Sequence, residues 1–96
     1  MEIQHEHLKT KGDFFILDDQ HKKIALMTYH MIDEKTMVIE HTEVQQVLEG
    51  KGIARKLVDA GVQFARESGF KIIPQCPYAA SVFRKTPEYS DVLAGY

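Results

Sequence analysis

Residues 44–57 read Val-Gln-Gln-Val-Leu-Glu-Gly-Lys-Gly-Ile-Ala-Arg-Lys-Leu. This stretch joins an apolar, β-branched run over residues 37–44 to a helical pattern over residues 51–68, with Gly50 and Gly52 at the junction. A glycine turn between a strand and a helix leaves backbone N–H groups without partners and lets a ligand approach them closely. Because the helix dipole also favours an anion there, the stretch predicts a phosphate-binding turn.

Three basic residues, Lys51, Arg55 and Lys56, lie in the first turns of the expected helix. The dipole disfavours positive charge at this end, so their placement indicates a bound anion. The alternative is a plain turn. The stretch is not a P-loop, because no Gly-Lys-Ser/Thr follows at the required spacing, and Arg55 replaces the third glycine of the dinucleotide fingerprint.

Size and composition limit the class of protein. The chain has 96 residues, of which 44% are hydrophobic and 27% charged, so we expect one globular domain over residues 1–96. A net charge of −2 gives no reason to expect nucleic-acid or membrane partners. The polar start is unlike a signal peptide, no apolar run approaches the length of a membrane span, and the single Cys76 excludes an internal disulfide. We therefore expect a cytoplasmic protein.

Hydrophobic patterning predicts an α+β fold. Short polar turns, one of them at residues 11–13, separate four apolar runs and allow only antiparallel neighbours. An amphipathic helix, a strand parallel to the fourth strand, and a second helix from Pro77 to Thr86 follow. The fold is therefore an antiparallel β-meander followed by a β-α-β-α unit, with strands at residues 3–8, 14–17, 23–32, 36–44 and 70–74, helices at 51–68 and 77–86, and a short helical turn at 88–93.

Three side chains are candidates for chemistry. Cys76 falls at the N-cap of the second helix, where the dipole favours thiolate, and the parallel strands bring it to the same cleft as the glycine turn. A small buried hydrophobe is its alternative role. His41 and Glu43 share one face of their strand and could supply a general base, or they could form a solvated face.

Two histidines and two aromatic residues are expected to have a structural role rather than a chemical one. His5 and His7 lie on the same side of an edge strand, but two imidazoles are too few for a zinc site, so we expect no metal. Tyr78 and Phe83 lie on the apolar side of the second helix, and their pattern predicts core positions.

The run from Glu49 to Ala54, between a strand and an amphipathic helix, resembles the acetyl-CoA-binding motif of the GCN5-related N-acetyltransferases, Gln/Arg-x-x-Gly-x-Gly/Ala. Gly52 and Ala54 match its last two marked positions, and Glu49 replaces the usual Gln or Arg. Residues 74–79, Pro-Gln-Cys-Pro-Tyr-Ala, and 87–89, Pro-Glu-Tyr, resemble a minimal subfamily of this family. The helical pair that normally follows the family's first strand, and helps to form the acceptor site, has no room in this chain.

The resemblance implies a minimal acyl-CoA N-acyltransferase fold and an acetyl-CoA-dependent N-acetyltransferase, without a metal. In the subfamily, the residues that match Cys76 and His41 are the proposed reactive groups near the thioester. The pantetheine arm would bind the backbone near Glu43 and Val44, and the pyrophosphate would bind residues 50–55. The full set of expected cofactor contacts is Glu43, Val44, Gly50, Lys51, Gly52, Ile53, Ala54, Arg55, Cys76, Pro77, Tyr78, Phe83 and Lys85, with the last two at the adenosine end.

Other functions remain open at this point. A non-catalytic acetyl-CoA-binding module or sensor that acts with a partner would carry the same motif, and an interaction protein could carry the glycine turn incidentally. The acceptor amine, small molecule or protein, is open as well. We expect a monomer, or a weak dimer through the exposed strand at residues 3–8.

Overall fold

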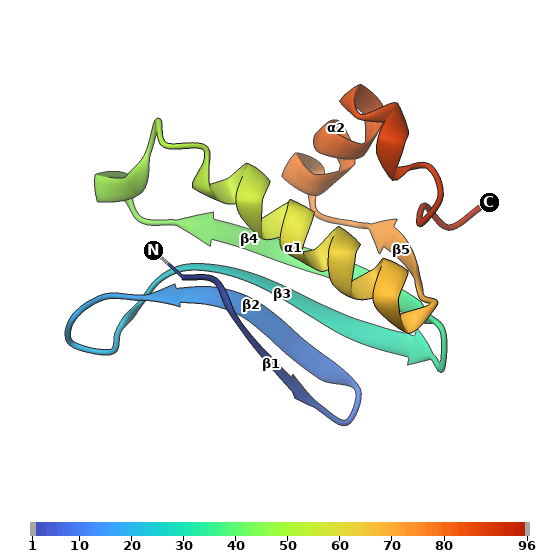
Figure 1. The fold of residues 1–96 in the computed structure, drawn as a ribbon, viewed down its shortest axis with the longest axis horizontal. Coiled ribbons are helices and arrows are strands. Elements are labelled where there is room, and N and C mark those ends of the chain that lie inside the picture. Colours follow the sequence, from blue (N-terminus) through green and yellow to red (C-terminus); the bar gives the residue numbers. More distant parts are fainter. Residues whose placement is uncertain (1, 96) are drawn as a thin grey trace.

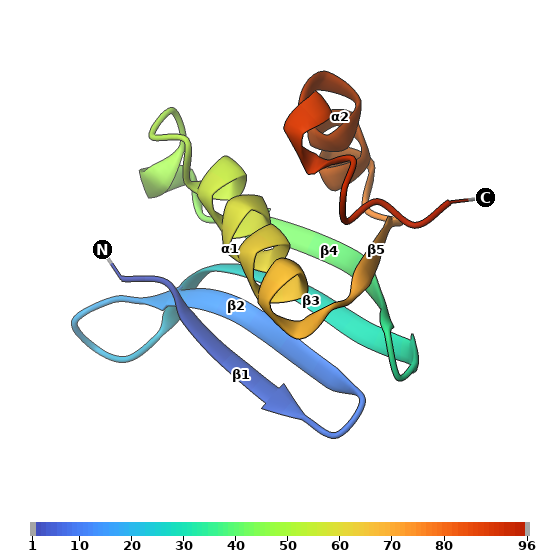
Figure 2. The same cartoon turned by 45° about the vertical axis from the view of Figure 1, so that its right-hand side comes forward.

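The computed structural model describes residues 2–95 and contains a five-stranded sheet with two helices. The strands are β1 (Gln4–Leu8), β2 (Lys11–Leu17), β3 (Lys23–Asp33), β4 (Thr36–Val44) and β5 (Lys71–Pro74), and they lie in the order β1-β2-β3-β4-β5. The helices are α1 (Ile53–Ser68) and α2 (Pro77–Lys85), and short 3₁₀ turns cover Gln46–Leu48 (η1) and Pro87–Tyr89 (η2). Both helices lie on the same side of the sheet (Figures 1 and 2).

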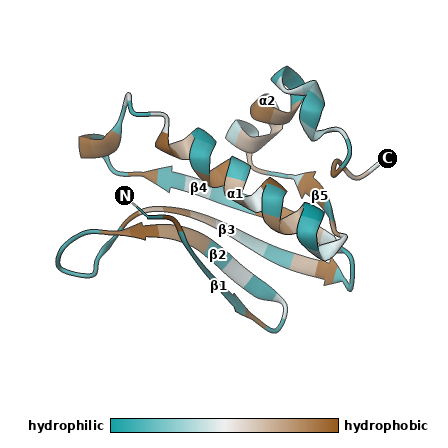
Figure 3. Ribbon diagram, viewed as in Figure 1, coloured by the Kyte–Doolittle hydropathy of each residue, from teal (hydrophilic) through white to brown (hydrophobic). Residues whose placement is uncertain are grey.

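The α+β prediction is confirmed in class and topology. Strands β1 to β4 form an antiparallel meander, and β5 pairs with β4 in parallel after the crossover through α1. Apolar and polar bands alternate along α1 (Figure 3). Its apolar stripe packs on the sheet because helical spacing gathers those side chains on one face. The buried core joins α1 to β3 and β4 through fully buried Leu57, Val62, Met27, Met37 and Ile39.

The expected turn at residues 11–13 is wrong. These residues belong to β2, and the turn lies one step earlier, where Lys9 has a φ of 56°. Gly12 is needed within the strand because a Cβ there would lie 2.6 Å from the carbonyl oxygen of Glu6 and would overlap the ring of Tyr29. The glycine therefore serves close packing here rather than a turn.

The two histidines of β1 point to the side of the sheet that the helices cover, and they anchor the strand there. His5 Nε2 and His7 Nδ1 are hydrogen-bonded to the Tyr29 hydroxyl at 2.5 and 2.8 Å. The ring of His5 also stacks on Phe14, with 4.1 Å between centroids, and meets Phe64 of α1 edge-on. The imidazoles thus share one side of the strand, as predicted, and they bind a phenol there.

The C-terminal end differs in detail from the prediction. The 3₁₀ turn η2 overlaps only the first two residues of the helical turn expected at 88–93. The residues after η2 run beside β5, with Leu93 bridging to Ile72. Between residues 2 and 95, the helices are too short or too polar to cross a membrane.

Candidate functional site

Strands β4 and β5 separate at the middle of β4. Their pairing runs from Thr36 and Lys71 to Ile39 and Pro74. At that point the N–H groups of Gln75 and Cys76 both donate to the carbonyl oxygen of Ile39, and the chain turns away into α2. The second half of β4 continues without β5 beside it, which opens a gap in the sheet at the carboxyl ends of two parallel strands. Ligands of such sheets bind at this kind of position.

A β-bulge at Glu40 changes which side chains face this gap. Thr28 pairs with His41 but Tyr29 pairs with Ile39, so Glu40 is the extra residue. Cross-strand partners share a face, and Tyr29 and Ile39 both point into the core. Beyond the bulge, His41 therefore points away from the helices and Thr42 points toward them.

The predicted phosphate-binding turn adopts the conformation that glycine permits. Gly50 and Gly52 have φ values of 81° and 70°, and a Cβ built on either would meet no atom within 4 Å. Gly52 is the N-cap of α1, no side chain caps this end, and the first turn carries no acidic residue. The first amides of a helix have no intrahelical acceptor. The N-terminus of α1 therefore offers free N–H donors and a partial positive charge to an anion, and the space beside Gly50 and Gly52 is open. These features fit the diphosphate of a nucleotide-containing ligand.

A pocket of about 230 Å³ lies between this turn, the end of β4 and the start of α2. Of the expected cofactor contacts, six line it: Val44, Gly50, Gly52, Ile53, Ala54 and Tyr78. Leu48 and Glu49 complete the lining. The prediction that Tyr78 is a core residue is wrong, because its side chain is 39% exposed. The first turn of α2 projects it into the pocket instead of onto the sheet.

Cys76 is buried at the N-cap of α2, beside the gap. Its Sγ donates a hydrogen bond to Thr42 Oγ1 at 3.5 Å. Burial raises the pKa of the Cys76 thiol, but the N–H of Ala79, the Thr42 hydroxyl and the N–H of Tyr78 outweigh burial, so that the net pKa lies below its ordinary value. The position predicted from the sequence is confirmed, and Thr42 is a contact that the sequence did not single out.

His41 and Glu43 are both well exposed and lie on the same face, with 3.8 Å between His41 Nε2 and Glu43 Oε2. Their shared face is therefore as predicted, but the bulge directs it away from α1 and α2. Phe83 is buried and packs edge-on against Tyr89, so its predicted core position is confirmed. This burial keeps its ring from facing a ligand in this structure, whereas Lys85 is exposed at the end of α2.

Lys51 and Arg55 are exposed beside the turn. Arg55 lies 3.6 Å from Asp59 and 5.5 Å from the centroid of the Tyr89 ring, so its guanidinium is directed along α1. Among residues 2–95 there is no group of three His, Cys, Asp or Glu side chains that could hold a metal ion.

A family model described as GCN5-related N-acetyl-transferase matches residues 13–92, which include the sheet gap, the glycine turn and Cys76. The chain belongs to the GCN5-related N-acetyltransferase family. Members of this family use acetyl-CoA, and the family and fold support acetyl transfer.

Relatives of similar size support the assignment. Protein NATD1 of Danio rerio is 32% identical over 83 residues, covering 85% of this chain and 74% of that protein. The human NATD1 is 28% identical over 86 residues, covering 88% and 75%. The solution structure of a GCN5-like protein from Staphylococcus aureus, described as a candidate N-acetyltransferase, has a TM-score of 0.75 at 37% identity and covers 99% of this chain and 89% of that one.

A more distant structure shares the fold alone. The aminoglycoside acetyltransferase from a soil metagenomic sample has a TM-score of 0.65 at 23% identity, covering 93% of this chain and 64% of that chain. The fold of the GCN5-related family is therefore established by both near and distant neighbours, whereas the acceptor substrate is not indicated by them.

Proposed function

We propose that this protein transfers an acetyl group from acetyl-CoA to an amine. The observation that carries the proposal is the glycine turn, where Gly50 and Gly52 leave an uncapped helix end open beside the gap between β4 and β5. We propose that the amides of residues 50–55 bind the diphosphate, assisted by Lys51 and Arg55. The pantetheine arm would then run along the unpaired half of β4, near Glu43 and Val44, toward Cys76.

Direct transfer is the route that the placement of the side chains favours. The amine nitrogen forms a bond to the thioester carbonyl carbon, the carbon–sulfur bond breaks, and coenzyme A leaves as the thiol after protonation. His41 or Glu43 takes the proton that the amine loses. Both lie on the open face of the sheet, from which an acceptor can reach the gap, since α1 and α2 cover the other face.

A route through acetyl-Cys76 is the variant. Here the thiolate attacks the carbonyl carbon and coenzyme A leaves, and the amine later takes the acetyl group from sulfur. The lowered pKa of the Cys76 thiol supports nucleophilic character. Its hydrogen-bond partner is Thr42, on the helix side, whereas His41 is directed to the other face. The structure therefore favours direct transfer over a Cys76–His41 pair.

Two measurements test these routes. Release of free coenzyme A from acetyl-CoA is followed with a panel of amines, and intact mass is measured after incubation with acetyl-CoA alone. Direct transfer predicts amine-dependent release, no acetylated protein, and activity retained in Cys76→Ser. An acetylated wild-type chain, together with an inactive Cys76→Ser, would instead support the covalent route.

A CoA-binding module or sensor is the second candidate, because no helix among residues 2–95 covers the face from which an acceptor would approach. Tight acetyl-CoA binding without turnover on any amine would support it. We also propose that the protein acts in the cytoplasm, as one domain, without nucleic-acid or membrane partners. It would be a monomer or a weak dimer through β1, and sedimentation velocity over a range of concentrations would measure this association.

A further inference from the structure

The face of the sheet opposite the helices carries an ordered row of polar side chains. The strand register pairs Glu6 with Asp13, Asp13 with Thr28, and Thr28 with His41. Their neighbours along the strands, such as Phe14 and Met27, point into the core, so the row points the other way. It begins at the edge strand β1 and ends at the sheet gap, where the amine must react under the proposed function.

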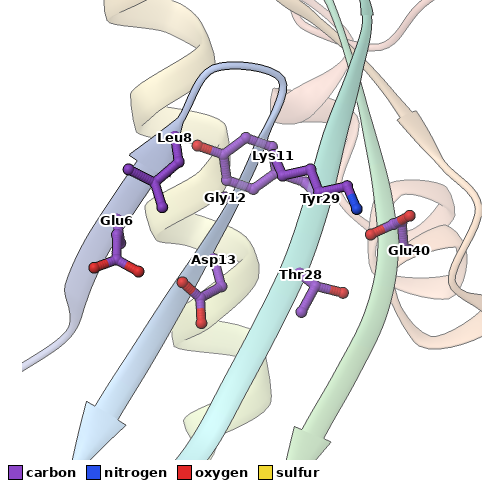
Figure 4. Close-up of a pocket in the computed structure, with 8 residues that line it drawn as sticks. All are labelled: Glu6, Leu8, Lys11, Gly12, Asp13, Thr28, Tyr29 and Glu40. Carbon is purple, nitrogen blue, oxygen red and sulfur yellow. The ribbon is translucent and has the colours of Figure 1, made fainter.

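A hollow of about 300 Å³ lies along this row. Figure 4 views it from the open face, with α1 passing behind the strands. It forms over Thr28, whose side chain is short. The walls stand on β1, β2 and β4 and combine one apolar, one basic and three acidic side chains: Leu8, Lys11, Glu6, Asp13 and Glu40.

The charges around the hollow are predominantly negative. Three carboxylates and one ammonium line it, and Glu6 has no ion-pair partner among residues 2–95. Asp13 Oδ2 accepts a hydrogen bond from Lys23 at 2.6 Å, which leaves Oδ1 for a ligand, and Glu40 pairs with His30 at 2.7 Å. The hollow thus complements a cation that also has an aliphatic chain.

The row sets the distance between this cation and the reacting amine. Neighbouring strands are about 4.8 Å apart, so Asp13 lies roughly 10 Å from His41 across β3, and Glu6 roughly 14 Å from it. A ligand that places one amine at His41 and a second ammonium between Asp13 and Glu6 must span this distance in an extended form. Thr28, between the two ends, is compatible with a methylene chain crossing β3.

We propose that the acceptor is a linear aliphatic polyamine. Its reacting primary amine lies by His41 at the gap, and a distant ammonium binds in the hollow between Glu6 and Asp13. This inference rests on the proposed acetyl transfer. The terminal nitrogen forms the amide bond, the carbon–sulfur bond of acetyl-CoA breaks, and the nitrogen's proton goes to His41 or Glu43, so the products are the N-acetylpolyamine and coenzyme A.

The first test compares amines of graded reach by the rate of coenzyme A release. Spermidine can span the row, putrescine is too short to reach Asp13, and n-butylamine has no second cation. We expect kcat/KM to be highest for spermidine, and the values for putrescine and n-butylamine to be lower and similar to each other. Equal use of spermidine and n-butylamine, or a clear preference for a lysine-containing basic peptide over spermidine, would overturn the proposal.

The second test removes the carboxylates singly. Glu6→Gln and Asp13→Asn should each raise the KM for spermidine about fivefold, the upper effect of one exposed ion pair, and leave n-butylamine kinetics unchanged. Glu67→Gln, an exposed carboxylate on α1, is the matched control and should change neither. If Asp13→Asn lowers the melting temperature, the kinetics of Glu6→Gln still decide, because Glu6 is exposed and forms no ion pair within residues 2–95.

Failure of this inference differs from failure of the proposed function. Coenzyme A release with n-butylamine, without a spermidine preference or an effect of Glu6→Gln, overturns only the polyamine assignment. Absence of release with every amine overturns both.

Discussion

Replacing Gly52 by aspartate should weaken coenzyme A binding by more free energy than it removes from the stability of the fold. Gly52 has φ 70° and ψ 21°, and its Cβ position is open, so an added side chain meets no atom within 4 Å. The left-handed conformation costs a non-glycine residue about 1 kcal/mol, which lowers the melting temperature of a chain of this size by roughly 4–8 °C. Interaction of the carboxylate with the helix dipole offsets part of this loss.

The effect on binding is electrostatic. Two unit charges 5 Å apart repel by about 3 kcal/mol at an effective dielectric of 20, and salt at an exposed site reduces this to roughly 2 kcal/mol. We therefore expect the dissociation constant for coenzyme A to rise about 30-fold. Isothermal titration calorimetry at constant ionic strength measures it directly.

Gly69→Asp is the matched control. Gly69 is the C-cap of the same helix, with φ 74°, ψ 26° and open space around its Cβ. The variant introduces the same strain and the same charge at the far end of α1, where the dipole disfavours a carboxylate. It should lose at least as much stability as Gly52→Asp and bind coenzyme A like the wild type. Equal affinity in Gly52→Asp and the wild type, or an equal loss in both variants, would refute the reasoning.

Three further predictions concern other parts of the chain. Ultraviolet titration of the Cys76 thiolate should give a midpoint below that of an unperturbed thiol, and Thr42→Val should raise it; an unchanged midpoint would contradict a role for the hydroxyl. Burial and the charge of a neighbouring histidine lower the pKa of His5, and Asp13 opposes them only in part. As the pH falls, His5 therefore binds a proton in the unfolded chain before it does so in the folded chain. The free energy of unfolding should therefore fall as the pH drops below 6.5. In thermal melts, the melting temperature of His5→Phe should depend less on pH than that of the wild type. An equal pH dependence in both proteins would show that His5 is not the cause. Gly12→Ala should lose about 1–3 kcal/mol of unfolding free energy by urea titration through overpacking, while Gly95→Ala, in open space, should lose almost none; comparable losses would argue against the clash.

Much of the fold could be predicted because hydrophobic spacing decides it. The two faces of β3, the amphipathic α1 and the short polar turns each favour one arrangement, and they agree with one another. Gly12 was misleading because its neighbours Lys11 and Asp13 have the composition of a turn. The reason for this glycine is Tyr29, which lies 17 residues later in the chain and whose ring lies over it.

The candidate site was predictable only in part. The glycine turn and the N-cap position of Cys76 depend on local signals, whereas the bulge at Glu40 depends on pairing with β3 and has no glycine or proline to mark it. Strict alternation places His41 on the same face as Ile39. The extra residue reverses this, and it is the reason that Thr42, rather than His41, contacts Cys76. Tyr78 was assigned to the core because helical spacing alone does not show that the first turn of α2 extends beyond the sheet.

The central claim is that backbone amides of the glycine turn hold the diphosphate of coenzyme A and direct its thioester to the gap between β4 and β5. Titration of the ¹⁵N-labelled protein with coenzyme A, followed by amide chemical shifts, tests it most directly. The account predicts the largest shifts at residues 50–55, with further shifts at Val44 and Cys76. Saturating coenzyme A that leaves these amides unchanged, or shifts only amides elsewhere, would contradict it.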